Sequence, residues 1–79
     1  MNNEELKNKL RCYAEQNYKV AKLLDWTFED LGEVVIRNDI KYRKVLLNQH
    51  FISKNNGITY HLKTPVLVPF NDGDEVIHY

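Results

Sequence analysis

The chain has few of the residues that cross-link a fold or interrupt it. It contains one cysteine, three glycines and two prolines among 79 residues. A single cysteine, Cys12, cannot close an intrachain disulfide, so we expect apolar packing to stabilise the fold and a reducing, cytoplasmic location. The scarcity of glycine and proline excludes collagen-like and low-complexity chains.

Long apolar runs and net charge are absent as well. No stretch approaches the roughly 18 apolar residues that a membrane span needs, so we expect no membrane partner. The polar N-terminus lacks the apolar core of a signal peptide. Eleven acidic residues balance eleven basic ones, which excludes a polycation built to bind nucleic acid over its whole surface. The length predicts a single domain, residues 1–79, with one modest core.

Sequence motifs of catalysis and of metal binding are also missing. The three glycines are widely spaced, so no phosphate-binding loop is present, and there is no nucleophile elbow. The histidines and Cys12 do not follow zinc-ligand spacing. Asp72, Asp74 and Glu75 form an acidic cluster that is too short for a calcium loop. We therefore expect no enzyme, no catalytic residue, no metal site and no cofactor.

The first third of the chain has the pattern of a helix. Apolar residues recur three and four positions apart from Leu6 to Leu24, which predicts one long amphipathic helix over residues 3–24 with Asn3 as its N-cap. Thr27 is followed by acidic residues, as at a capped helix start, and predicts a second short helix ending near Leu31.

From residue 33 onward the pattern favours strands. The β-branched run 34–36 and the segment 41–47 flank Asn38 and Asp39, so we predict a hairpin with Glu33 opposite Lys44. The stretch 54–57 ends in Asn-Gly, which predicts a second hairpin turn. Pro65 and Pro69 bracket a short segment that suits an edge strand, and residues 74–79 predict a last strand. The fold class expected is therefore α+β: a long N-terminal amphipathic helix packed on a small antiparallel sheet of about four to six strands.

Residues 39–50 also allow a different architecture. If this stretch is helical, the order of elements resembles a winged helix-turn-helix domain over about half of the chain. In that resemblance residues 46–52 end a recognition helix and residues 57–62 belong to its wing. The resemblance implies a DNA-binding transcriptional regulator, in which Lys41, Arg43 and Lys44 enter the major groove and Lys54 lies on the wing.

Charge is unevenly distributed although it sums to zero. Residues 34–63 hold six basic residues and one acidic residue, whereas both flanking segments are acidic. Basic and aromatic residues are densest in the middle, which predicts an anion-seeking surface. The candidate macromolecule-binding residues are Arg37, Lys41, Tyr42, Arg43, Lys44 and Lys54. Trp26 and Phe28 are candidates for an apolar contact if they are not buried.

A small domain without catalytic motifs is expected to act by contact. Our leading hypothesis is a non-enzymatic binding protein, a regulator, adaptor or inhibitor that occupies a macromolecular surface. Its partner is either a protein or a nucleic acid. The high lysine and asparagine content suggests a low-GC bacterium or one of its phages or mobile elements. The apolar end, residues 76–79, predicts a weak homodimer formed by pairing of an exposed strand edge.

Overall fold

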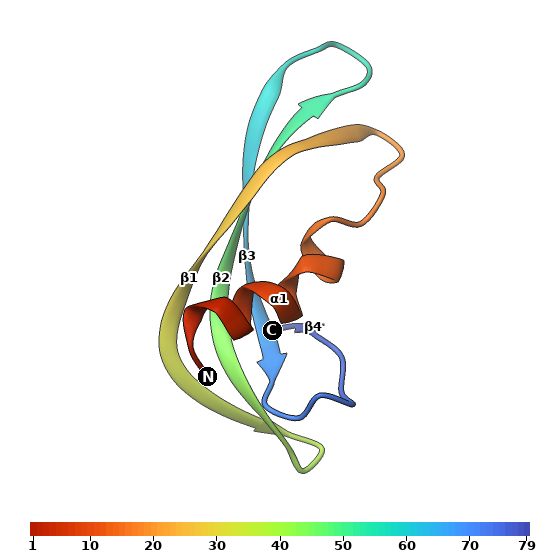
Figure 1. Cartoon of the computed structure of the whole chain (residues 1–79). Coiled ribbons are helices and arrows are strands. Elements are labelled where there is room, and N and C mark those ends of the chain that lie inside the picture. The colour runs from red at the N-terminus through yellow and green to blue at the C-terminus, as the bar shows by residue number, and fades with distance from the viewer.

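The fold is one helix followed by a meander of antiparallel strands, in a computed structural model that describes residues 1–79 (Figure 1). The helix is α1 (Asn3–Ala14), and the strands follow as β1 (Ala21–Arg37), β2 (Ile40–Ser53), β3 (Thr59–Pro69) and β4 (Ile77–His78). The strands pair in sequence order β1-β2-β3-β4. The expected α+β class with a small antiparallel sheet is therefore confirmed.

Both predicted hairpins are present. Asn38 and Asp39 adopt positive φ angles of 51° and 63°, as the two central residues of a type I′ turn require. The turn aligns Glu33 with Lys44, and their charged groups are 3.4 Å apart. The second turn contains Gly57 at φ 72° and joins β2 to β3. In both cases local turn chemistry fixed the strand register.

The predicted long helix is wrong beyond residue 14. Leu6, Leu10 and Ala14 are fully buried, whereas Val20 and Leu24 at the continuation of the same stripe are exposed. From Ala21 the chain is extended and pairs with the end of β2. Hydrogen bonds to a distant strand replace those of the last helical turns, and the periodicity of residues 3–24 carries no information about that strand. Asn2, one residue before the expected cap, accepts a hydrogen bond from the Glu5 N–H at 2.8 Å.

Two other helical interpretations are also wrong. Residues 27–31 belong to β1. In this strand every second side chain, at Trp26, Phe28 and Asp30, lies on the face of the sheet that α1 covers. Residues 40–53 form β2, which pairs along most of its length with β1 on one side and β3 on the other. No recognition helix exists in this stretch, and the winged-helix architecture is excluded. In residues 40–51 the apolar residues are scattered widely around a helical wheel, and this scatter indicates that the segment is not an amphipathic helix.

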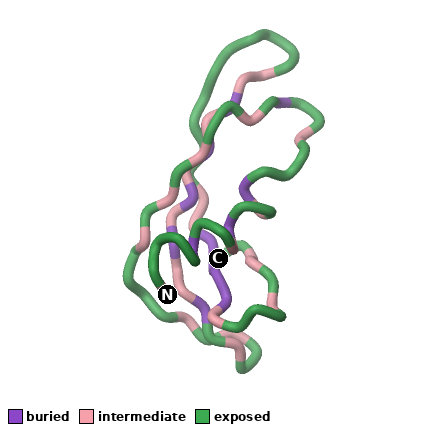
Figure 2. The backbone as a smooth tube through the Cα atoms, in the orientation of Figure 1, coloured by how far each residue is buried: buried purple, intermediate pink, exposed green.

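The core lies between α1 and one face of half of the sheet. Leu6, Leu10 and Ala14 pack against alternate residues of β2 and β3, namely Val45, Leu47, Val66 and Val68. The other half of the sheet extends past α1, so the molecule measures 43 × 20 × 19 Å. Figure 2 shows buried backbone concentrated beside α1 and mostly exposed backbone at the far end. We call that far end, residues 50–62 with the start of β1, the projecting end.

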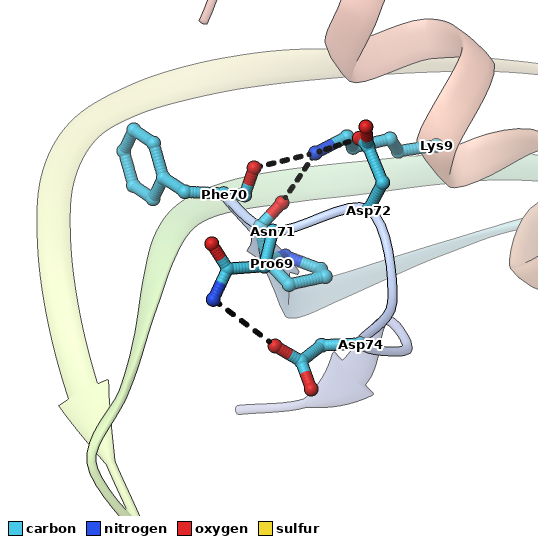
Figure 3. A network of polar contacts seen from close by, with 6 residues as sticks. All are labelled: Lys9, Pro69, Phe70, Asn71, Asp72 and Asp74. Atoms are coloured by element: carbon cyan, nitrogen blue, oxygen red, sulfur yellow. Dashed lines mark hydrogen bonds and ion pairs between the residues drawn. The ribbon is translucent and has the colours of Figure 1, made fainter.

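A polar contact fixes α1 to the chain that follows β3 (Figure 3). The Lys9 ammonium donates hydrogen bonds to the carbonyls of Pro69 and Phe70 at 2.9 and 3.0 Å. It also lies 3.4 Å from the Asp72 carboxylate, while Asn71 donates to Asp74. Lys9 therefore stabilises the turn that returns the chain toward β4.

The edges of the sheet differ from those expected. Val66 and Leu67 pair with β2 on one side and with β4 on the other, so the segment between the prolines is not an edge. The last strand is limited to Ile77 and His78. β4 is the outer strand of the sheet, as expected for the C-terminal residues, but it covers only the end of β3, so the first half of β3 is an edge as well. The long strand β1 forms the opposite edge. The one helix, α1, has 12 residues, too few to span a membrane.

We predict that Leu47→Ala lowers the free energy of unfolding by about 2–5 kcal/mol, because Leu47 is fully buried between β2 and α1. Ile36→Ala, at a side chain that is 69% exposed, changes it by less than about 0.5 kcal/mol. Urea denaturation measures both. Equal effects of the two substitutions would contradict this placement of the core.

Candidate partner-binding groove

The basic residues predicted to form one surface are divided by the strand geometry. Arg37 and Lys44 lie on the face of the sheet away from α1, whereas Lys41 and Arg43 lie on the other, as strand alternation in β2 requires. Tyr42 is only 5% exposed and belongs to the scaffold. Lys54 lies at the projecting end, in the turn after β2. The six residues therefore do not form one continuous patch.

Three of these cations contact aromatic rings near the C-terminal segment. The Arg37 guanidinium and the Lys44 ammonium lie 5.1 and 3.9 Å from the centroid of the Tyr79 ring. Arg37 also donates to the Tyr79 main-chain oxygen at 2.8 Å. Lys41 lies 4.8 Å from the Phe70 ring. These cation–π contacts attach residues 70–79 to the sheet, which gives the charges a role within the fold.

Arg43 is engaged by a carboxylate. It forms a two-pronged pair with Asp30, with both N···O distances 2.9 Å. Asp30 also accepts a hydrogen bond from the Gly32 N–H at 2.9 Å, beside the second irregularity of β1. The hydrogen bond from Arg43, followed by that from Gly32, lowers the pKa of Asp30 below its usual value.

Trp26 and Phe28 are half-buried. Both pack against the core cluster, and their ring centroids are 6.5 Å apart. The Trp26 indole N–H donates to the Glu15 carboxylate at 2.8 Å, and Arg11 donates to the same oxygen at 3.3 Å. Trp26 thus connects β1 to the C-terminal end of α1 while keeping part of its ring accessible.

A groove of about 650 Å³ opens between α1, the following loop and the start of β1. We call it the α1–β1 groove. The helix contributes Lys7 and Arg11, the loop contributes Glu15 to Tyr18, and β1 contributes residues 21–26, with Lys54 at one end. Leu23, Leu24 and Trp26 give it an apolar strip, so both charged and apolar groups converge on one concave surface.

The walls of this groove are fixed by hydrogen bonds from β2 and the turn after it. The buried amide of Gln49 donates to the Ala14 carbonyl at 2.9 Å and to the Tyr18 hydroxyl at 3.0 Å. Lys54 donates to the Tyr18 carbonyl from its side chain and to the Val20 carbonyl from its backbone. The Tyr18 ring packs edge-on against Phe51 at 4.9 Å. The loop that lines the groove is therefore preformed, which reduces the entropic cost of binding.

The groove carries an excess of positive charge. Its lining includes the cations Lys7, Arg11, Lys22 and Lys54 against the carboxylates Glu15 and Asp25. Glu15 is already paired with Arg11, whereas Lys7 and Lys22 are exposed and form no ion pair. Sequence reasoning missed these two residues because it assigned both to one continuous helix. Lys22 lines the groove only because the chain after α1 is extended and pairs as β1 with β2.

No protein-family model, curated protein or solved structure matches this chain.

His50 and His61 stack at 4.3 Å on adjacent strands, with His50 3.6 Å from Asp25. No group of three His, Cys, Asp or Glu side chains is arranged to hold a metal ion. The α1–β1 groove, at about 650 Å³, is larger than the groove of about 420 Å³ between α1 and the segment that follows β3.

We predict that Asp30→Asn destabilises the protein at neutral pH and has little effect in strong acid. Because the folded pKa of Asp30 is lowered, its contribution to stability is present above the unfolded pKa of about 3.9 and is lost as the pH falls through the folded value. Urea denaturation between pH 7 and pH 2 compares the two proteins. Asp39→Asn is the matched control, since Asp39 is exposed and unpaired. A stability difference that does not shrink in acid would contradict the pairing.

Proposed function

We propose that this chain is a non-enzymatic binding protein that acts by contact, as adaptors and inhibitors do, and that the α1–β1 groove is its contact site. The observation that carries the proposal is the combination in one preformed groove of the unpaired cations Lys7 and Lys22 with the apolar strip at Leu23, Leu24 and Trp26. A partner that fits this combination is a protein segment with acidic and apolar side chains.

The competing nucleic-acid partner has weaker support. The basic residues on which it depended are divided between two faces, and Arg43 and Lys44 are paired with carboxylates. The groove itself offers an apolar strip that phosphates do not use. A protein segment uses both the charges and the apolar surface, so we favour a protein.

Binding to the groove can be followed by tryptophan fluorescence. Trp26 is the one tryptophan of the chain and lies in the groove lining. Selection from a random peptide display library with the wild-type protein is expected to enrich peptides that contain both acidic and apolar residues. Synthetic copies of the enriched peptides are expected to change the Trp26 fluorescence, which gives the dissociation constant directly.

We predict that the double variant Lys7→Glu with Lys22→Glu weakens binding of the selected peptides by roughly ten-fold or more, because two attractive charges become repulsive. Lys63→Glu makes the same change at an exposed lysine of β3 outside the groove and is expected to leave the dissociation constant unchanged. Fluorescence titration measures both. An unenriched library, or peptides indifferent to the groove variant, would refute the proposal.

A further inference from the structure

The first half of β3 is an unprotected strand edge. β4 and Tyr79 cover only Pro65, Val66 and Leu67 on the outer side of β3. Residues 59–63 have β2 on one side and no strand on the other, and all five are exposed. We call residues 59–64 the free segment; its beginning belongs to the projecting end (Figure 1).

The free segment lacks most of the features by which proteins block strand edges. The opposite edge, β1, carries two irregularities, at Leu24 and around Gly32, and several acidic side chains. By contrast, β3 pairs with β2 without any register shift, and the free segment contains no proline and only one charged residue, Lys63. A regular edge with exposed apolar side chains is a template for pairing with another strand.

The direction of the free backbone groups follows from two hydrogen bonds. The Ile58 carbonyl accepts from Ser53 of β2, whereas the Pro65 carbonyl accepts from Tyr79 on the opposite side. Because alternate residues of a strand point their N–H and C=O groups the same way, odd-numbered residues point outward. Thr59, His61 and Lys63 therefore present their N–H and C=O groups to solvent.

We infer that the free segment pairs with its own copy in a second molecule, forming an antiparallel dimer about a two-fold axis at His61. In this register Thr59 lies opposite the second copy's Lys63, and His61 lies opposite itself. Every outward N–H and C=O of these three residues then has a partner, as does the equivalent set in the second copy. A two-fold interface of this type is self-complementary by construction.

The side chains favour the same register. Tyr60 and Leu62, which are 41% and 47% exposed, share one face of β3. With the axis at His61, each Tyr60 lies opposite the second copy's Leu62, so both apolar side chains lose exposed area. The neighbouring register, with its axis at Leu62, would pair Thr59 with Pro65, which has no N–H and whose carbonyl is already used. It would also set His61 opposite Lys63.

The rest of the molecule leaves room for this pairing. α1 packs beside the far half of β3, so an antiparallel second copy carries its own helix to the opposite end of the joined sheet (Figure 1). The α1–β1 groove lies at the β1 edge of the sheet, and β2 separates β1 from β3. The inference therefore does not depend on the proposed function. The pairing is shorter than a standard interface, which makes the dimer weak.

Cysteine cross-linking tests the register. In a Cys12→Ser background, His61→Cys is expected to form a disulfide-linked dimer under mild oxidation, because paired Cα atoms about 5.5 Å apart meet disulfide geometry. Lys63→Cys is the matched control: the two Lys63 positions are displaced by four residues, about 13 Å along the strands. Cross-linking at residue 63 or 62 rather than 61 would overturn the register.

Sedimentation at high micromolar concentration tests the dimer itself. The full chain is expected to show a monomer–dimer equilibrium, and Leu62→Lys to raise its dissociation constant roughly ten-fold or more, because it adds two cations to the apolar contact. Val34→Lys is the control, since Val34 on β1 is 48% exposed and lies at the other end of the sheet from the free segment. A monomer at all concentrations, or a dimer unaffected by Leu62→Lys, would overturn the inference.

Discussion

The fold depends on the packing of one short helix against a sheet that is much longer than the helix. α1 has 12 residues and is about 18 Å long, whereas the molecule is 43 Å long. Leu6, Leu10 and Ala14 bury the middle of β2 and the second half of β3 beneath the helix, whereas residues 54–62 of the projecting end are exposed. The core, the groove at the end of α1 and the exposed half of β3 all follow from this difference in length.

The charges of the chain divide into those that hold the fold and those that remain available. Lys9, Arg37, Arg43 and Lys44 each contact a carbonyl, a carboxylate or an aromatic ring that belongs to another element. They fasten α1, β1 and the C-terminal segment to the sheet. Lys7 and Lys22 have no such partner, although they are less conspicuous in the sequence. Local density of charge is therefore a poor guide to a binding surface, because dense charge along paired strands finds partners across them.

The two edges of the sheet differ in their regularity and in their charge. β1 is irregular and acidic along its edge and borders a groove, which suits selective contact with a separate partner. The free segment of β3 is regular and nearly uncharged, which suits pairing with an identical strand. Gly32, at φ 75°, permits the second irregularity of β1. A few residues that perturb one edge thus make the two edges of one sheet different in regularity and charge.

The sequence by itself determined what depends on neighbouring residues: the start of α1, both hairpin turns, the Glu33–Lys44 pair and the α+β class. Tertiary structure alone decided where α1 ends and that residues 27–31 are extended, because those residues bond to β2, which lies later in the chain. It likewise decided the groove, since Lys7 and Lys22 line one concave surface only because β1 pairs with β2. The periodicity of apolar residues indicates which side chains are buried, but it does not identify the distant strand with which a segment pairs. In residues 21–31, hydrogen bonds to β2 form in place of the helix that the periodicity predicts.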